Sequence, residues 1–357
     1  MLLLKLLFIP VMIFGFLAGR KIYLKHGSIF TNKALGKKLN IWLLGAFLFA
    51  VAAAAFIRLT FDIELMLPQY VRMHATHFKW FGVELLFSAF IGFAAGIYSG
   101  EIFRFRFKFY LTSAILLVII FGFENFYTRP IFNLCKDIEK DGVVFQTFQS
   151  TCGPASLANL FRAFGKKISE REAARLARTR YTGTTGNELA AAAAAISPDI
   201  YAYYFKLNLD ELEKLELPCV LSFNEEHFVV YSKKRKHLYE YIDPSIGTCY
   251  AKKDDLMAEW DGKALFIFDR DFTFTLSKGI KDQKASVIKK ALNDFFSTDK
   301  SFQPLEINDE YDEKLENAVI LFCSVKKINR NVKNIINPYA NLAIMSAAKK
   351  ANASSSR

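Results

Sequence analysis

The sequence predicts an α+β fold that follows a bundle of about four membrane-spanning helices, and three observations support it. Hydrophobic residues make up 52% of the 357 positions, with 36 Phe, which is high for a protein that lies wholly in water. The apolar excess is concentrated before residue 127. From Val143 onward, amphipathic helices come first and short strands afterwards, and this order is typical of the α+β class.

Four apolar runs in the N-terminal region are predicted to be the membrane helices. They are Leu2–Leu17, Ile41–Ile57, Val83–Ile97 and Phe109–Phe123. With flanking residues, each approaches the roughly 20 apolar residues that a helix needs to cross a bilayer core of ~30 Å. One or two buried core helices, or a cleavable signal peptide at the first run, are the alternatives. The basic cluster follows the first run instead of preceding it, which favours an anchor.

Basic residues in the short loops predict the orientation, because loops rich in Lys and Arg stay in the cytoplasm. The first and third loops are the basic ones, with Arg20, Lys21, Lys25, Lys33, Lys37 and Lys38 in the first and Arg104, Arg106 and Lys108 in the third. We therefore expect a multi-pass protein of the bacterial inner membrane. Its residues after about Tyr127 are expected on the extracytoplasmic side, with the lipid bilayer as a partner.

The net charge of +12 does not indicate a nucleic-acid partner, because much of the basic excess lies in these loops and the rest is scattered. All five Cys follow the last apolar run: Cys135, Cys152, Cys219, Cys249 and Cys323. An odd count leaves at least one thiol free. In an oxidising compartment, four of them can form two disulfides and leave Cys152 free.

The polar part of the chain is predicted to form three helices and then five strands. The helices are expected at 152–164, 169–178 and 187–196, and the strands at 219–223, 228–232, 238–242, 248–250 and 264–268. After residue 270 the signals weaken to an amphipathic helix near 285–296, an apolar run at 318–325 and a tail expected to be disordered. The predicted domains are residues 1–127, 128–270 and 271–357, the last without an assigned role.

Cys152 is the candidate nucleophile, because it precedes Gly153 and Pro154 at the start of a predicted helix. The free N–H groups and partial positive charge of a helix N-terminus favour a thiolate. A lone Cys at a helix start is more often an ordinary small residue. The assignment therefore depends on partners elsewhere in the chain.

His227 is the candidate base among five His, because it stands at the head of the apolar strand Phe228-Val-Val-Tyr. The others are expected in a membrane loop (His26), at the membrane interface (His74, His77) and in the basic turn (His237). If the hairpin after His227 is centred on Arg235, His227 and Asp243 are direct cross-strand neighbours. Asp243 is then able to orient the imidazole, although an ordinary Asp-Pro turn explains it equally well.

An acyl-transfer site also needs donors for the developing oxyanion, commonly a backbone N–H and a side-chain amide. Gln146 and Gln149 both precede Cys152 closely, and either is also explained as a solvated loop residue. His74 and His77 have a spacing compatible with a metal site, but a third ligand is not apparent. We expect no metal and no cofactor.

These motifs together resemble the bacteriocin-processing peptidases that cut after a double-glycine leader, which have a papain-like fold. The motifs are Gln146 six positions before Cys152-Gly-Pro-Ala-Ser-Leu, then Tyr181-Thr-Gly-Thr-Thr-Gly-Asn-Glu-Leu, His227-Phe-Val-Val-Tyr and Tyr241-Ile-Asp243-Pro. The resemblance covers about residues 143–270. It implies a Cys152, His227 and Asp243 triad with Gln146 in the oxyanion hole, and a groove role for the Thr182–Gly186 loop.

The resemblance implies a membrane-anchored cysteine peptidase that hydrolyses a peptide substrate, at a Gly-Gly or small-residue site, next to a separate secretion system. Well-known members carry the peptidase ahead of an ABC exporter, whereas here it follows the apolar runs and no Walker motif is found. The chain is therefore not expected to drive export itself. The alternatives are a transglutaminase or amidase that uses the same triad, and a catalytically silent peptide-binding or assembly protein.

Overall fold

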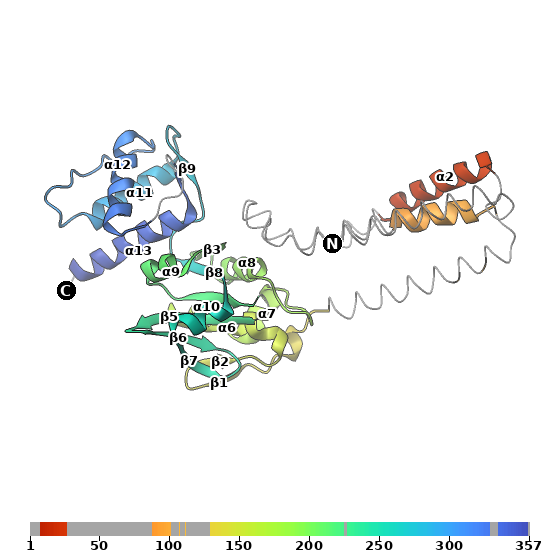
Figure 1. The fold of residues 1–357 in the computed structure, drawn as a ribbon, viewed down its shortest axis with the longest axis horizontal. Coiled ribbons are helices and arrows are strands. Elements are labelled where there is room, and N and C mark those ends of the chain that lie inside the picture. Colours follow the sequence, from red (N-terminus) through yellow and green to blue (C-terminus); the bar gives the residue numbers. More distant parts are fainter. Residues whose placement is uncertain are drawn as a thin grey trace. The chain divides into compact units, whose positions relative to one another are not determined.

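The computed structural model describes residues 8–26, 88–100, 107, 111, 129–224, 227–328 and 335–355. The chain divides into two compact units, residues 1–127 and 128–357 (Figure 1). Each unit is described by itself below.

Two helices pack closely in the first unit, α2 (Phe8–His26) and residues 88–98. Glycines line the contact on both sides. A methyl group added at Gly19 would lie 2.0 Å from the carbonyl oxygen of Phe93, and one at Gly96 would lie 2.0 Å from that of Phe16. Such spacing requires glycine at the contact, and it is an arrangement that lets two helix backbones approach each other.

The predicted bundle of four membrane helices has no support in the described residues. Among them, no helix is both long enough and apolar enough to cross a membrane. The runs at 41–57 and 109–123 lie outside the described residues, except for Leu111.

The second unit begins with short elements, which are followed by three helices. The first of these helices carries the predicted nucleophile. In chain order these are η2 (Phe132–Leu134), β1 (Ile138–Lys140), β2 (Val143–Phe145), η3 (Gln149–Thr151), α6 (Cys152–Ala163), α7 (Glu170–Leu176) and α8 (Gly186–Ile196). The three predicted helices are present. Helix α6 begins at Cys152, and the chain leaves it through Gly165 at a φ of +76°, a conformation that favours glycine.

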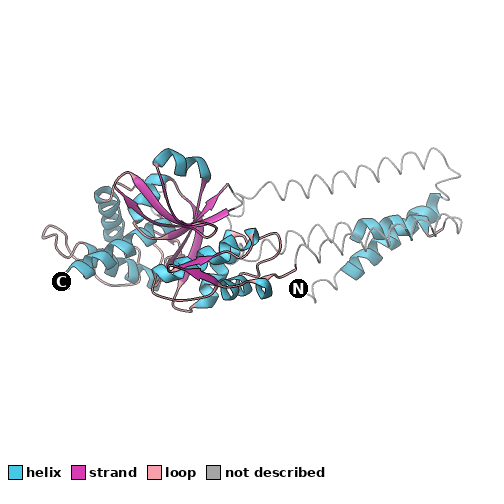
Figure 2. Ribbon diagram, turned by 90° about the horizontal axis from the view of Figure 1, so that it is seen from below, coloured by secondary structure: helices cyan, strands magenta, loops and turns pink. Residues whose placement is uncertain are grey.

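A six-stranded antiparallel sheet follows in the order β3-β8-β4-β5-β6-β7. Figure 2 shows its strands in magenta. The strands are β3 (Tyr201–Lys206), β4 (Cys219–Phe223), β5 (His227–Arg235), β6 (Leu238–Asp243), β7 (Gly247–Ala251) and β8 (Trp260–Phe268), with α9 (Leu209–Leu215) and α10 (Lys253–Glu259) between them. The five predicted strands are present. The edge strand β3 was not predicted, although Ser197-Pro198-Asp199 separates its Tyr-rich sequence from the Ala-rich helix.

The two faces of the sheet are covered by different parts of the chain. Phe228 faces α6, since a methyl group on Gly153 would touch its ring at 3.3 Å. Val229 points to the opposite face, as successive residues of a strand do, and it belongs to a core shared with the C-terminal helices. His227 and Asp243 therefore lie in a sheet whose second face is closed by residues beyond 271.

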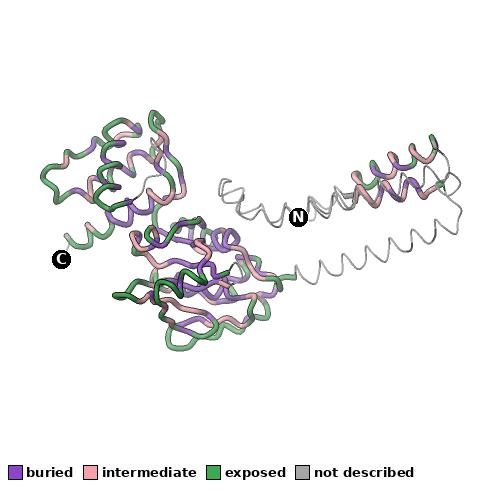
Figure 3. The backbone as a smooth tube through the Cα atoms, viewed as in Figure 1, coloured by how far each residue is buried: buried purple, intermediate pink, exposed green. Residues whose placement is uncertain are grey.

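That second face is covered by residues for which the sequence suggested no role. They form β9 (Leu276–Ser277), α11 (Gln283–Phe295), α12 (Glu313–Val325), β10 (Ile335–Ile336) and α13 (Pro338–Ser355). Phe272 contacts Phe268 and Tyr203, and Tyr339 contacts Phe205. Burial continues from the sheet into these helices (Figure 3). The tail expected to be disordered is instead helical as far as Ser355.

Candidate active site

Cys152 is the first residue of α6 and is 5% exposed. The turn η3 leads into it, and Thr151 closes this turn by accepting from the Phe148 N–H at 3.0 Å and donating to the Phe148 carbonyl at 2.9 Å. The first N–H groups of a helix have no partner within the helix. The thiol therefore lies where free N–H groups favour negative charge on sulfur or on a bound oxyanion.

Three residues on one face of α6 connect it to the other parts of the site. Ser156 and Asn159 follow Cys152 at positions i+4 and i+7, which lie on the same side of a helix. The Ser156 hydroxyl donates to the Phe228 carbonyl at 2.8 Å, directly beside His227. Asn159 bonds both backbone groups of Val144, at 2.8 Å each. The buried helix thus fixes the nucleophile against the strand of the base.

His227 and Asp243 meet through their side chains, with His227 Nε2 3.0 Å from Asp243 Oδ1. The predicted register was wrong, however. Arg235 pairs with Leu238, so the hairpin turn is centred between Lys236 and His237 and not on Arg235. His227 and Asp243 are therefore diagonal neighbours on adjacent strands, and the imidazole side chain is long enough to span the two-residue offset between them.

A β-bulge keeps them on the same face of the sheet. Tyr231 pairs with Tyr241 and Lys233 with Glu240, so Ser232 has no partner in the ladder. If Ser232 instead paired with Tyr241 in a regular ladder, Asp243 would lie opposite Val230, on the face opposite to His227. The sequence gives no clear signal for the bulge, because Ser232 resembles any other position of an alternating strand.

The hydrogen bonds of His227 favour its protonated form. Burial alone would lower its pKa. Hydrogen bonds to Asp243 and Cys152, together with the charges of both groups, outweigh burial and raise the pKa to about 10. With Nε2 held by Asp243, the other ring nitrogen is available to Cys152. The ring is thus placed to engage the carboxylate and the candidate nucleophile at the same time.

Ser245 is a partner of the site that the sequence analysis missed. Its N–H and hydroxyl both donate to Asp243 Oδ1, at 2.8 and 2.5 Å. Burial would raise the pKa of Asp243, but the hydrogen bonds from His227 and Ser245 lower it below its usual value. A Ser two residues after an Asp often closes such a turn, so the Asp-Pro-Ser sequence contained a usable signal.

Gln146 follows β2 and is tied to the Asp243 turn, because its N–H donates to the Pro244 carbonyl at 2.8 Å. No hydrogen bond from the described residues engages its side-chain amide, and its Oε1 is buried without a partner. Such an atom is costly, and it is often found at functional sites. Gln149, the alternative, is exposed in η3. The structure thus brings Gln146 to the turn that follows Asp243.

The Thr182–Gly186 loop lies beside the segment that precedes Cys152. Gly183 has a φ of +100°, and a methyl group there would be 3.9 Å from the Ser150 carbonyl oxygen. An Arg180–Glu188 ion pair at 2.7 Å holds the base of the loop. The loop therefore lies next to the turn that leads into Cys152, and Tyr181, directly before the loop, is exposed.

Comparison with known families matches the part of the chain that carries these residues. The model of the peptidase C39 family matches residues 140–271. This stretch is a peptidase C39 domain. All four candidate residues lie within the C39 domain, as do α6 and the six strands of the sheet.

Relatives of the C39 domain include proteins from bacteria and archaea. The colicin V secretion/processing ATP-binding protein CvaB of Escherichia coli is 30% identical over 133 residues, which cover 35% of this chain and 18% of that protein. An uncharacterized protein of Methanothermobacter thermautotrophicus is 28% identical over 137 residues, covering 38% and 95%. The peptidase domain of Streptococcus ComA is 22% identical with a TM-score of 0.33, covering 35% of this chain and 96% of that domain.

The other Cys and His residues that the sequence analysis considered do not join the site. The two disulfides considered for an oxidising compartment are not formed, because all five Cys, Cys152 among them, are free thiols. His74 and His77 lie outside the described residues, and the residues that the structure describes contain no group of His, Cys, Asp or Glu suited to a metal ion. His237 is exposed at the hairpin turn.

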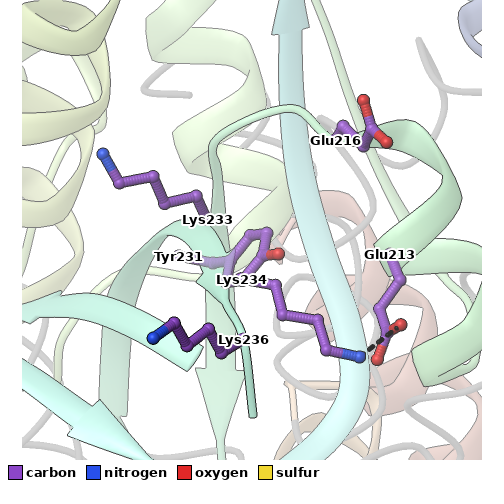
Figure 4. A pocket seen from close by; sticks show the side chains of 6 residues that line it. All are labelled: Glu213, Glu216, Tyr231, Lys233, Lys234 and Lys236. Carbon is purple, nitrogen blue, oxygen red and sulfur yellow. Dashed lines mark hydrogen bonds and ion pairs between the residues drawn. The ribbon is translucent and has the colours of Figure 1, made fainter. Parts of the chain in front are cut away.

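A cavity of about 480 Å³ lies at the opposite end of β5 from His227. It is lined by Glu213, Glu216, Tyr231, Lys233, Lys234 and Lys236 (Figure 4). Lys234 is bound to Glu213 at 2.8 Å, whereas Lys233 and Lys236 extend to the other side of the Tyr231 ring. The ammonium groups do not converge on one point, and we assign this cavity no part in the chemistry.

Proposed function

We propose that the protein is a cysteine peptidase in which Cys152 attacks a peptide carbonyl, His227 transfers the proton, Asp243 orients the imidazole and Gln146 stabilises the oxyanion. The observation that carries the proposal is the His227 arrangement. One ring nitrogen is held by Asp243 at 3.0 Å, and Cys152 at the start of α6 is close enough to the same ring to help raise the pKa of His227. A set of this kind is what acyl transfer through a thioester requires.

The chemical steps follow from these positions. The thiolate of Cys152 attacks the carbonyl carbon, and the negative charge on the oxygen is met by the Cys152 N–H and the Gln146 amide. His227 then donates its proton to the leaving amine, and the thioester remains on Cys152. In the second half, neutral His227 takes a proton from water, the water attacks the thioester, and the thiol is released.

The proposed substrate is a peptide or secreted protein cut after a Gly-Gly or other small-residue site. Support comes from the secretion and processing role in the name of the colicin V relative. The Thr182–Gly186 loop lies next to the turn before Cys152, and we propose that it restricts the space for side chains next to the scissile bond. A separate secretion system is the proposed partner.

The proposal is tested with purified protein and a fluorogenic peptide that ends in Gly-Gly before the reporter amine. Wild type is expected to release the reporter and to be alkylated by iodoacetamide at Cys152. Cys152→Ala and His227→Ala are expected to lose release of the reporter. Cys249→Ala, which removes a half-buried thiol outside the triad, serves as the matched control. Unchanged release by Cys152→Ala would refute the nucleophile, and transfer of the acyl group to an added amine would favour a transamidase.

The proposed location is the bacterial inner membrane with the peptidase domain on the extracytoplasmic side. This part of the proposal rests on the apolar runs and on the basic first and third loops. A reporter fused directly after Phe126 tests it. Alkaline phosphatase activity of the fusion supports the outward orientation, and fluorescence of a cytoplasmic reporter at the same site contradicts it.

A further inference from the structure

A buried carboxylate outside the triad holds the segment that carries Gln146. Glu170, the first residue of α7, is 0% exposed. Both of its oxygens accept from Thr147, which directly follows Gln146. The Thr147 N–H donates to Oε1 and the Thr147 hydroxyl donates to Oε2, each at 2.6 Å. Burying a carboxylate is costly unless its oxygens are satisfied, so this pair is a specific attachment.

The Gln146 segment is anchored on both sides. Before Gln146, Asn159 holds both backbone groups of Val144. At Gln146, the N–H is bound by the Pro244 carbonyl. After it, Thr147 is held by Glu170 and also accepts from the Lys136 N–H at 2.8 Å. The first two anchors come from α6 and from the Asp243 turn, whereas Glu170 comes from α7.

The position of the Gln146 amide depends on these backbone anchors, because its own side chain has no partner among the described residues. An oxyanion donor contributes most when it is held in place before the reaction begins. A backbone that rotates at Thr147 would move the amide by far more than a hydrogen bond tolerates.

We propose that Glu170 is a positioning residue for the oxyanion hole, and that it fixes Thr147 and thereby aims the Gln146 amide at the reacting carbonyl oxygen. This inference rests on the proposed peptidase function. It assigns to α7 a role in catalysis without contact between Glu170 and the substrate.

The test compares Glu170→Gln and Thr147→Val with Thr147→Ser and with the control Glu172→Gln. Glu170→Gln keeps the size of the side chain but presents a donor to the Thr147 hydroxyl in place of an acceptor. Thr147→Val removes the hydroxyl while Glu170 stays, and Thr147→Ser restores it. Glu172 is an exposed carboxylate on the same helix, so its change reports on charge alone.

Two readouts separate positioning from folding. Iodoacetamide alkylates a thiolate without forming an oxyanion, so its rate at Cys152 is expected to stay within twofold of wild type in every variant. Hydrolysis of the Gly-Gly peptide does form an oxyanion. Its kcat is expected to fall roughly 10-fold in Glu170→Gln and Thr147→Val, with KM unchanged, against roughly 100-fold in Gln146→Ala. Thr147→Ser and Glu172→Gln are expected to match wild type.

The double variant Glu170→Gln with Gln146→Ala decides the mechanism. If Glu170 acts through Gln146, the double variant is no slower than Gln146→Ala alone. Additive losses, or a Glu170→Gln enzyme with the kcat of wild type, would overturn the inference and leave the peptidase assignment intact. A wild-type protein that neither cleaves the peptide nor reacts at Cys152 would overturn the proposed function, and this inference with it.

Discussion

Asp243 lies on the strand next to His227 but two positions away from direct pairing, and its Oδ1 is still 3.0 Å from His227 Nε2. The bulge at Ser232 makes this contact possible, because it places both side chains on one face. The contact fixes the ring and raises the pKa of His227 to about 10 together with the partner Cys152. Predictions for the site follow from this relationship.

Replacement of Asp243 by Asn is expected to narrow the alkaline range of the enzyme. The amide still accepts from Nε2–H, so the ring keeps its orientation, but the negative charge that raises the His227 pKa is lost. His227 supplies a proton to the leaving amine, and this form is lost as pH rises through its pKa. The alkaline limb of kcat is therefore expected to move from near pH 10 toward the ordinary His value of about 6.5. A pH profile of peptide hydrolysis checks this, and an unmoved limb would contradict it.

Ser245→Ala is expected to change the stability of the protein at acidic pH. The Ser245 hydroxyl helps to lower the pKa of Asp243, so its loss lets that pKa rise toward the usual value. The stability that ionised Asp243 provides is present above its ordinary pKa and is lost as pH falls through its folded pKa. In Ser245→Ala this stabilisation is therefore smaller, and its loss is complete at a higher pH. The hydrogen bond removed contributes about 1 to 2 kcal/mol. Urea unfolding between pH 3 and 7 measures this, with Ser301→Ala, in an exposed turn far along the chain, as the control.

Asn159→Ala is expected to reduce stability and activity together. It leaves the N–H and carbonyl of buried Val144 without their partner, which costs about 2 to 4 kcal/mol in the free energy of unfolding. It also releases β2, which leads to Gln146, so kcat is expected to fall. Urea unfolding and peptide hydrolysis report the two effects. Asn317→Ala, at an exposed position of α12, is expected to change neither, and equal stability of the two variants would refute the role of Asn159.

Phe272→Ala tests whether the C-terminal helices belong to the core of the peptidase sheet. Phe272 is 0% exposed and contacts Phe268 and Tyr203. Removal of a buried ring leaves a cavity and costs about 3 to 5 kcal/mol. The midpoint of urea unfolding of the sheet is expected to fall, whereas Val287→Ala, at a 40% exposed position of α11, is expected to shift it little. Separate transitions for sheet and helices, with only the second shifted, would contradict a shared core.

Local signals were sufficient for the helix that carries Cys152 and for the strands that carry His227 and Asp243. Pro154 and Gly165 marked the two ends of α6, and short runs rich in apolar and aromatic residues marked β4, β5 and β6. The same signals failed at the hairpin turn, since Lys236 and His237 lack the Asn-Gly or Asp-Gly pattern that locates a two-residue turn. The predicted centre was therefore wrong, although the predicted contact is present.

Two features needed the tertiary structure because they depend on residues far apart in the chain. Glu170 and Thr147 are 23 positions apart, and neither residue has a local pattern that predicts a buried pair. The core formed with Phe272 and Tyr339 depends on apolar residues with weak local periodicity. Side-chain partners of this kind are chosen by packing, which brings together whatever the folded chain places at one point.

By itself, the sequence determined the order and chemistry of the site: a thiol at a helix start, an imidazole at a strand start and a carboxylate at a strand end. These depend on residue type and on short-range periodicity, which can be read along the chain. The tertiary structure decided how they meet. The Ser232 bulge placed His227 and Asp243 on the same face of the sheet. Ser156 and Asn159 fixed α6 against β5 and β2, and the C-terminal helices covered the second face of the sheet. Each of these is a choice between long-range contacts, and linear spacing does not specify it.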